Sequence, residues 1–145
     1  MNKNIEIEIQ LTNNNATVPS RKHDSDIGYD ISSSVDVLIP SNEVQLIHTG
    51  IAINLPNQCA GFVLPRSGLA SKNKITLINS PGLVDPGYTG ELMVPLINHG
   101  STDYQISIGD RIAQLVLINT SSVEFKIVDN LPDTERSTGG FGSTD

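Results

Sequence analysis

Apolar and polar residues alternate along the first stretch of the chain. Within residues 5–11, isoleucine or leucine occupies every odd position and glutamate or glutamine every even one. Because successive side chains of a strand point to opposite faces, this period of two predicts a strand with one wet face. A second alternating stretch covers residues 51–55 and ends at Pro56-Asn57. Further short and mainly apolar runs cover residues 59–64, 74–78, 91–97, 111–118 and 123–128.

Glycine and proline separate many of these runs, as at Pro81-Gly82 and Pro86-Gly87. Short strands spaced about ten residues apart are typical of a sandwich or barrel. Helical periodicity is nearly absent, and only residues 67–72 suit a short helical turn. Pro95 cannot donate a hydrogen bond within its run, which predicts a sheet edge or a bulge there. We therefore expect a single all-β domain.

The character of the chain changes at Leu131. The segment after it is rich in Gly, Ser and Thr and lacks the apolar residues of a core element, which favours a flexible tail. It carries one arginine, Arg136, and one phenylalanine, Phe141. A mobile segment with a guanidinium and an aromatic ring suits a lid over a nucleotide. We divide the chain into a β core, residues 1–130, and a C-terminal arm, residues 131–145.

Composition narrows the class of protein. Hydrophobic residues make up 37% of the chain and aromatic residues 4%, so the core must be aliphatic. The single cysteine, Cys59, excludes an internal disulfide and suits a buried apolar position. No apolar run approaches the roughly 20 residues of a membrane span, and the N-terminus lacks the apolar region of a signal peptide. We expect a soluble intracellular protein without a membrane partner, cytoplasmic, or nuclear if its source is eukaryotic or viral.

The formal net charge of -7 also restricts the partners. It argues against nucleic-acid binding, which needs a basic surface to release counterions. A phosphate-rich ligand would need arginines, backbone N–H groups and a divalent cation concentrated at one place.

Four segments have residues suited to such a site. Asp30, beside Gly28, is either a turn former or a carboxylate that holds metal-bound water. Arg66-Ser67-Gly68 offers a guanidinium, a hydroxyl and N–H groups, which suits an anion cradle as well as a helix cap. Gln114 interrupts an apolar strand, so its amide serves either a core hydrogen bond or a ligand.

The remaining segment, residues 79–92, has two adjoining Pro-Gly turns. Turn formation is the ordinary role of Asp85 there. The segment nevertheless combines the amide of Asn79, the carboxylate of Asp85 and the phenol of Tyr88. That combination suits a hairpin that reads a base and carries a general base at its edge.

Taken together, Pro65–Ala70, Gly82–Leu92, Gly109–Val116 and Gly139–Thr144 closely resemble, in this order, motifs of the trimeric dUTPase family. The resemblance extends from near Asp24 to the end of the chain. It implies a jelly-roll-like distorted barrel of short strands and a homotrimer with active sites shared between subunits. It also implies Mg²⁺-assisted hydrolysis of dUTP to dUMP and pyrophosphate, which keeps uracil out of DNA and supplies dUMP for dTMP synthesis.

The resemblance assigns the catalytic and phosphate-binding roles. Asp85 corresponds to the residue that activates the attacking water, and Gln114 to the residue near that water and the α-phosphate. Asp30 corresponds to the anchor that holds Mg²⁺ through water. The phosphate cradle corresponds to Arg66, Ser67 and Gly68. Arg111 suits a phosphate contact or a structural ion pair, and we favour the ion pair.

The resemblance also assigns the groups that select the nucleoside. Tyr88 is expected to pack flat on the deoxyribose and to leave no room for a 2′-hydroxyl. From the tail, Phe141 is expected to stack over uracil, with Gly142 beside it, and Arg136 to hold the γ-phosphate. Uracil is expected to be read by Asn79 and by backbone groups near Leu83, Val84 and Met93.

Asp26-Ile27, Ser137 and Asp145 depart from the family pattern, and the last two bear on how the tail orders over a triphosphate. Three other classes of protein compete with the hydrolase. A dCTP deaminase would need a glutamate base and an alanine-lined pocket where this chain has Asp85 and Tyr88. A regulatory binding protein on the same scaffold would not require catalysis. An adhesion or capsid-like β-sandwich would account for the strands and for none of the polar clusters.

Overall fold

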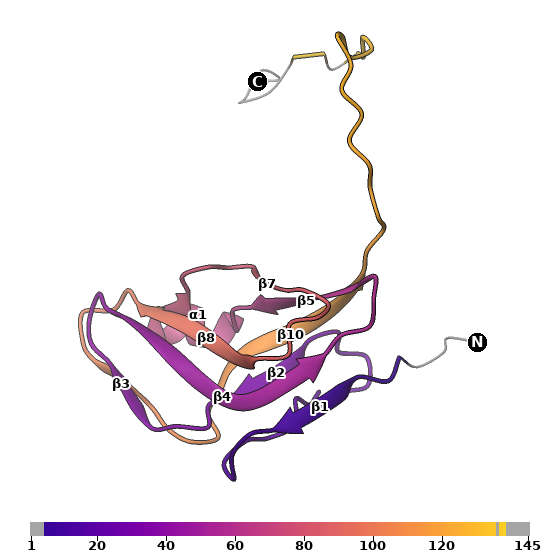
Figure 1. Cartoon of the computed structure of the whole chain (residues 1–145). Helices are drawn as coiled ribbons and strands as arrows, with labels where there is room; N and C mark the ends of the chain where they lie inside the picture. Colours follow the sequence, from indigo (N-terminus) through magenta and orange to yellow (C-terminus); the bar gives the residue numbers. More distant parts are fainter. Residues whose placement is uncertain (1–4, 136, 139–145) are drawn as a thin grey trace.

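The computed structural model describes residues 5–135 and 137–138 and is built almost wholly from short strands (Figure 1). Ten strands and one helix follow one another as β1 (Glu8–Leu11), β2 (Tyr29–Ser32), β3 (Val37–Ile39), β4 (Val44–Asn54), β5 (Cys59–Leu64), α1 (Ser67–Asn73), β6 (Ile75–Leu77), β7 (Gly82–Val84), β8 (Glu91–Asn98), β9 (Tyr104–Ile106) and β10 (Arg111–Asn119) in the described ranges. Among these residues, no helix has the length and apolar character needed to cross a membrane.

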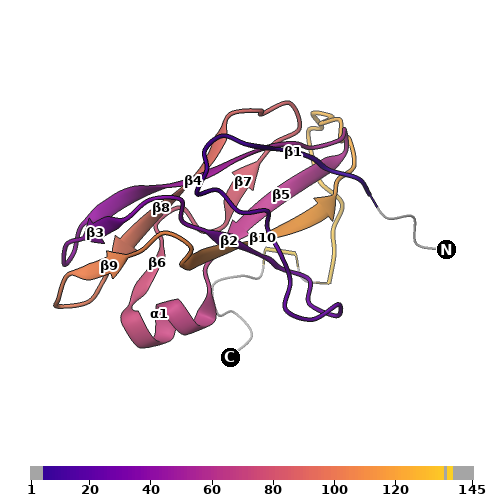
Figure 2. The ribbon, with the colours of Figure 1, turned by 90° about the horizontal axis from the view of Figure 1, so that it is seen from below.

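The strands form two four-stranded antiparallel sheets and a small ribbon. One sheet has the order β1-β4-β8-β6, the other has the order β2-β10-β5-β7, and β3 pairs with β9. Figure 2 shows α1 at one end of the body, next to β6. The expected all-β, jelly-roll-like fold is confirmed, and in the described part of the chain the sheets pack together without closing into one continuous barrel.

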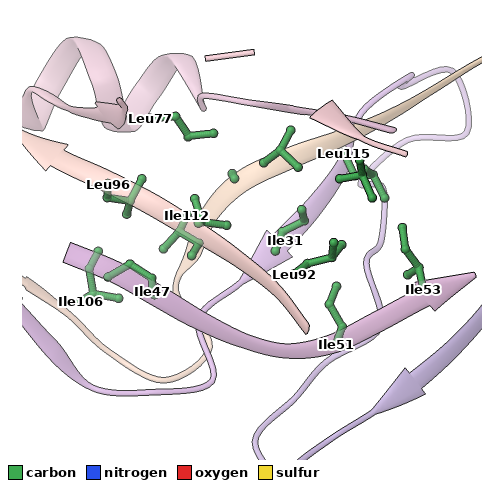
Figure 3. Packing of buried hydrophobic residues seen from close by; sticks show 14 of the residues in the cluster. Ile31, Ile47, Ile51, Ile53, Leu77, Leu92, Leu96, Ile106, Ile112 and Leu115 are labelled. Atoms are coloured by element: carbon green, nitrogen blue, oxygen red, sulfur yellow. The ribbon is translucent and has the colours of Figure 1, made fainter. Parts of the chain in front are cut away.

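Aliphatic side chains fill the space between the two sheets (Figure 3). Ile47 and Leu96 come from one sheet, and Ile31 and Ile112 come from the other, and all four are almost completely buried. Cys59 is also buried, as predicted. Isoleucine suits this layer because β-branched side chains pack well on a pleated surface.

Most of the predicted elements are present. The runs 59–64, 91–97 and 111–118 correspond to β5, β8 and β10, and the helical turn at 67–72 to α1. The helix ends at Lys74, whose φ of 59° lies in the left-handed region and turns the chain away from the helix axis. The first two predicted strands differ in length, because β1 begins only at Glu8 and β4 extends back to Val44.

The prediction for Pro95 is wrong, because β8 is an internal strand between β4 and β6. Pro95 lies opposite Leu46 of β4, outside the bulge that the β4–β8 pair contains. Its carbonyl accepts a hydrogen bond from the Ile78 N–H at 3.1 Å, just beyond the end of β6. The proline nitrogen also points toward Ile78, beyond the end of β6, so the missing N–H interrupts no hydrogen bond of the β6–β8 ladder.

The prediction of a strand at 123–128 is also wrong. After Asn119 the chain leaves the body as an extended segment (Figure 1), and residues 120–135 form no helix or strand. The side chains of Phe125 and Ile127 are 92% and 97% exposed. Alternation alone does not make a strand, because a strand needs a neighbour for its backbone groups. The division of the chain at residue 130 stays a prediction.

Candidate active site

The side chains predicted to read the nucleoside gather in one hollow of about 240 Å³ between β7 and β8. Apolar residues of both strands form its floor, and the loop between the strands forms its rim. The predicted residues that line this first hollow are Asn79, Leu83, Val84, Asp85, Tyr88 and Met93. The structure therefore brings together all the residues that segment 79–92 and β8 were expected to contribute.

Local hydrogen bonds shape the rim of the first hollow. The Tyr88 N–H donates to the Asp85 carbonyl at 3.2 Å, and Gly87 between them has a φ of 86° that favours glycine. The Tyr88 hydroxyl donates to the Glu91 carbonyl at 2.9 Å. The carboxylate of Asp85 and the ring of Tyr88 both remain accessible to a ligand.

Strand β7 provides backbone groups for recognition. In the described part of the chain it pairs with β5 alone and so forms the edge of its sheet. An edge strand presents N–H and C=O groups that no neighbouring strand uses. Asn79 packs closely at the start of β7, since a Cβ on Gly82 would lie 3.2 Å from its amide nitrogen. This edge can offer both donors and acceptors to a base.

The predicted phosphate-binding residues line a second, larger hollow of about 520 Å³. Its lining comes from the loop before β2, the turn into α1, and β10. The predicted residues that line it are Asp30, Arg66, Ser67, Gly68 and Gln114. Lys22 and Arg111, which were not assigned to the site, line it as well.

Asp30 lies between two guanidinium groups in this second hollow. Its Oδ1 accepts from Arg66 Nε at 2.8 Å, and its Oδ2 accepts from Arg111 Nη1 at 3.0 Å. The ion pair that we favoured for Arg111 is therefore present. Arg66 also donates from Nη1 to the Arg111 carbonyl at 3.3 Å. These bonds orient Arg66 and leave other guanidinium N–H groups for a phosphate.

Gln114 is fixed by the turn that carries the anion cradle. Its Nε2 donates to the Pro65 carbonyl at 2.8 Å, so the core hydrogen bond considered for this amide exists. In the sheet Gln114 lies opposite Asp30 on one side and Leu64 on the other. A Cβ on Gly28 would lie 2.4 Å from Gln114 Oε1, so glycine at position 28 leaves room for the amide.

The residues of the second hollow fit a weakly held cation better than a caged one. Among the described residues, no group of three or more His, Cys, Asp or Glu side chains is placed to bind a metal ion. Mg²⁺ keeps several waters when it binds a nucleotide, so it requires only one or two carboxylates. Each oxygen of Asp30 has one guanidinium bond and keeps acceptor capacity for metal-bound water.

The departure at Asp26-Ile27 also lies at the second hollow. The carboxylate of Asp26 accepts the His23 N–H at 2.9 Å, and Arg21 donates to the Asp26 carbonyl at 3.0 Å. Asp26 thus forms a turn, as aspartates near glycine often do. Ile27 is exposed at the rim.

The two hollows have no lining residue in common. The first hollow lies between β7 and β8, whereas the second is lined by the loop before β2, the turn into α1 and β10. One chain therefore holds the two predicted parts of a nucleotide site without joining them.

Several site predictions fall on residues of the tail. Arg136, Phe141, Gly142 and Asp145 lie outside the described residues. Ser137 is described, and its φ of 43° is a conformation that glycine adopts more easily.

Sequence reasoning missed His48 and Glu91. Their side chains meet at 3.0 Å between His48 Nδ1 and Glu91 Oε2, and Glu91 lines the first hollow. They are 43 residues apart in sequence, and no spacing rule connects them.

Comparison with known proteins places the chain in a family. The dUTPase family model matches residues 14–145. A relative from Gloeothece citriformis, named deoxyuridine 5′-triphosphate nucleotidohydrolase, is 49% identical over 129 residues, or 89% of each chain. A relative of the same name from Crocosphaera subtropica is 45% identical and covers 97% of this chain and 99% of its own.

Solved structures show the same likeness. A mutant of the phage 80alpha dUTPase has a TM-score of 0.90 at 30% identity and covers 96% of this chain and 98% of its own. Another mutant of that enzyme, solved with dUpNHpp, has a TM-score of 0.90 at 29% identity, with 95% and 97% covered. A mutant dUTPase from phage phi11 of S. aureus, described with a structural Mg(II) ion, has a TM-score of 0.83 at 28% identity and covers 89% of this chain and 100% of its own.

Proposed function

The chain belongs to the dUTPase family and hydrolyses dUTP, and from this premise we propose how its own residues perform the reaction. The observation that carries the proposal is the division of the polar residues between two hollows without a common lining residue. The first hollow has the chemistry to hold uracil and deoxyribose, and the second has the chemistry to hold phosphates. Each active site combines the first hollow of one copy with the second hollow of another.

In this reaction, Asp85 accepts a proton from a water molecule that attacks the α-phosphorus in line. The new bond joins the water oxygen to the α-phosphorus, and the bond from that phosphorus to the bridging oxygen of the pyrophosphate breaks. Gln114, held by the Pro65 carbonyl, lies near the α-phosphate and the water. Arg66, Ser67 and Gly68 hold the phosphates and stabilise the negative charge that develops on their oxygens.

The first hollow selects the nucleoside. Tyr88 packs on the deoxyribose and excludes a 2′-hydroxyl. Asn79 and the backbone near Leu83, Val84 and Met93 read the donors and acceptors of uracil, which cytosine does not match. A wall close to C5 rejects the methyl group of thymine, because a tight pocket excludes a larger base more easily than a smaller one.

Magnesium suits this site as a cofactor that arrives with the nucleotide. When bound, Mg²⁺ would supply positive charge that offsets the charge of the triphosphate. Asp30 would hold it through water, using acceptor capacity that its two guanidinium bonds leave. Asp30 also keeps Arg66 oriented for the phosphates.

A homotrimer would assemble the complete site. The exposed side chains of Val123, Phe125 and Ile127 support association, because apolar residues on an extended segment are commonly buried against a partner. The tail residues Arg136, Phe141 and Gly142 would then close a site on a neighbouring copy. We place the enzyme in the cytoplasm, where removing dUTP would keep uracil out of DNA and provide dUMP.

Pyrophosphate release from dUTP, dTTP, dCTP and UTP, each with Mg²⁺ or with a chelator, tests this function. We expect rapid turnover of dUTP alone and a strong loss with the chelator. Ammonia release from dCTP would favour the deaminase class. Tight binding of dUTP without turnover would favour a regulatory protein on the same scaffold.

A further inference from the structure

The ladder between β4 and β8 is interrupted next to the first hollow. His48 lies opposite Met93, but the next pair is Ala52 with Glu91. Residues 49–51 of β4 therefore face Leu92 alone. Such a bulge leaves backbone groups that the ladder does not pair, and Gly50 within it has a φ of 69°.

The side chain of Glu91 joins the two sides of this bulge. Its Oε1 accepts the Gly50 N–H at 2.8 Å, and its Oε2 meets His48 Nδ1 at 3.0 Å. The Glu91 side chain is 24% exposed, and its contact with Gly50 is partly shielded from water, whereas its contact with His48 is exposed. The hydroxyl of Thr49 donates to the Leu92 carbonyl and adds a further link between the same strands. Glu91 thereby fixes the start of β8 on β4.

The backbone of the same residue holds Tyr88. The Tyr88 hydroxyl donates to the Glu91 carbonyl at 2.9 Å. The ring also lies against Gly90, where a Cβ would come within 2.7 Å of the hydroxyl oxygen. The position of the ring therefore depends on the position of the Gly90–Glu91 backbone, and the Glu91 carboxylate determines where that backbone lies relative to β4.

We propose that Glu91 is a positioning residue for Tyr88, and that its contacts with Gly50 and His48 set the discrimination between deoxyribonucleotides and ribonucleotides. This inference rests on the proposed role of Tyr88 against the deoxyribose. A ring that excludes one hydroxyl by contact loses its selectivity when it moves by a fraction of that group's size. Glu91 lines the first hollow, and in this scheme it acts on selectivity by holding the Tyr88 ring.

The test compares kcat and KM for dUTP and for UTP in the parent, Glu91→Ala, Glu91→Gln and Asp103→Ala. Asp103 is the matched control, because its carboxylate also accepts a distant backbone N–H, that of Ser41 at 3.1 Å, and it does not line the first hollow. We expect Glu91→Ala to lower the ratio of kcat/KM for dUTP to that for UTP by about tenfold, mainly through KM. Glu91→Gln keeps an acceptor for Gly50 and should stay within about threefold of the parent. Asp103→Ala should keep the parental ratio.

A double-mutant cycle with Tyr88→Phe separates positioning from general support of the fold. Without the Tyr88 hydroxyl the link to Glu91 is lost, so Glu91→Ala should then change the ratio less than it does in the parent. An equal effect in both backgrounds would overturn the inference. If Glu91→Ala does not fold, His48→Ala removes one partner of the carboxylate and should shift the ratio in the same direction by a smaller factor, and an unchanged ratio would overturn the inference.

The two proposals fail in different ways. A parent enzyme that is selective for dUTP, together with a folded Glu91→Ala variant that retains the parental ratio, would overturn the role of Glu91 and leave the proposed function standing. A parent that releases no pyrophosphate from dUTP would overturn the proposed function itself.

Discussion

At the scale of single residues, Asp30 and Asp85 differ in what surrounds their carboxylates. Asp30 is bound on both oxygens by Arg66 and Arg111. Asp85 is exposed at the rim of the first hollow and, within the described residues, forms no ion pair. A carboxylate without a bound cation can accept a proton from water, whereas a doubly paired one is a better anchor. The structure thus supports different roles for two residues of the same type.

Replacing Asp85 with asparagine tests the base directly. The amide keeps the size of the side chain and cannot accept a proton at neutral pH, so turnover of dUTP should fall by at least about a hundredfold. Nucleotide affinity should change little. Pyrophosphate release and equilibrium binding of dUTP measure the two quantities, and near-normal turnover would remove Asp85 from its role.

The pKa of the Glu91 carboxyl gives a second test at this scale. Burial raises this pKa, but the hydrogen bonds from His48 and from the Gly50 N–H, together with the charge of His48, lower it, and the net shift is downward. A carboxyl whose pKa is lower in the folded state adds stability above its unfolded pKa of about 4.3, and loses this contribution as the pH falls through the folded pKa.

Urea unfolding between pH 7 and pH 3 checks this expectation. The parent should exceed Glu91→Gln in free energy of unfolding at about pH 5, and the difference should shrink below about pH 4.3. A difference that is independent of pH would show that ionisation of Glu91 does not stabilise the fold.

At the scale of elements, the bulge in β4 depends on glycine. A Cβ on Gly50 would lie 2.5 Å from Asn13 Nδ2 and 2.7 Å from the Ala16 Cβ, and the backbone has a φ of 69°. Gly109 has a comparable φ of 89° but nothing within 4 Å of such a Cβ. The two positions therefore separate the cost of backbone conformation from the cost of a clash.

We expect Gly109→Ala to lower the free energy of unfolding by about 1–2 kcal/mol, for the conformation alone. Gly50→Ala should cost roughly 1–3 kcal/mol more, because the Asn13 turn must move away. Urea or thermal unfolding of both variants gives the comparison. Equal decreases in the free energy of unfolding would mean that the Asn13 turn moves away from the new Cβ without an energetic cost.

Sequence patterns predict a strand well when the strand with which it pairs lies in the same chain. The runs at 59–64 and 111–118 form β5 and β10, which pair with each other. The run at 123–128 has the same kind of pattern and no strand beside it. Strands β2, β3, β7 and β9 have only three or four residues each and were missed. Strands β1 and β6 are equally short, but each lies within a longer alternating or apolar run that indicated it.

The same reasoning applies to the site. Turn chemistry indicated Asp85 and Tyr88, because those residues are close in sequence. The pairing of Asp30 with Arg66 and Arg111 spans 36 and 81 residues, and it depends on how β2 and β10 pair. The contact of His48 with Glu91 depends on a bulge that no local pattern marks.

At the scale of the whole molecule, the separation of the two hollows predicts complementation between defective chains. Asp85→Asn damages the first hollow and Arg66→Ala damages the second. In a trimer assembled from equal amounts of both, about a quarter of the shared sites would receive an intact half from each chain. Pyrophosphate release from the co-assembled mixture should therefore recover to a comparable fraction of the parental rate.

The matched control combines Asp85→Asn with Tyr88→Ala. Both changes lie in the first hollow, so no arrangement of subunits combines two intact halves, and the mixture should release no more pyrophosphate than the mean of the two variants alone. No recovery with Arg66→Ala would mean that each chain forms its own complete site, whereas recovery in this control would mean that Asp85 and Tyr88 do not belong to the same half of a site. Light scattering on the same samples reports whether three chains associate.

In the proposed trimer, the exposed segment after β10 would link the folding of one copy to the activity of another. Phe125 and Ile127 are almost fully exposed in a single chain. A newly synthesised copy would therefore carry an exposed apolar segment until it associates with other copies. The rate of dUTP hydrolysis would then rise more steeply than the protein concentration, because dilute chains would remain unassembled and inactive. Cells that make little of this protein would lose sanitisation of their nucleotide pool abruptly rather than in proportion.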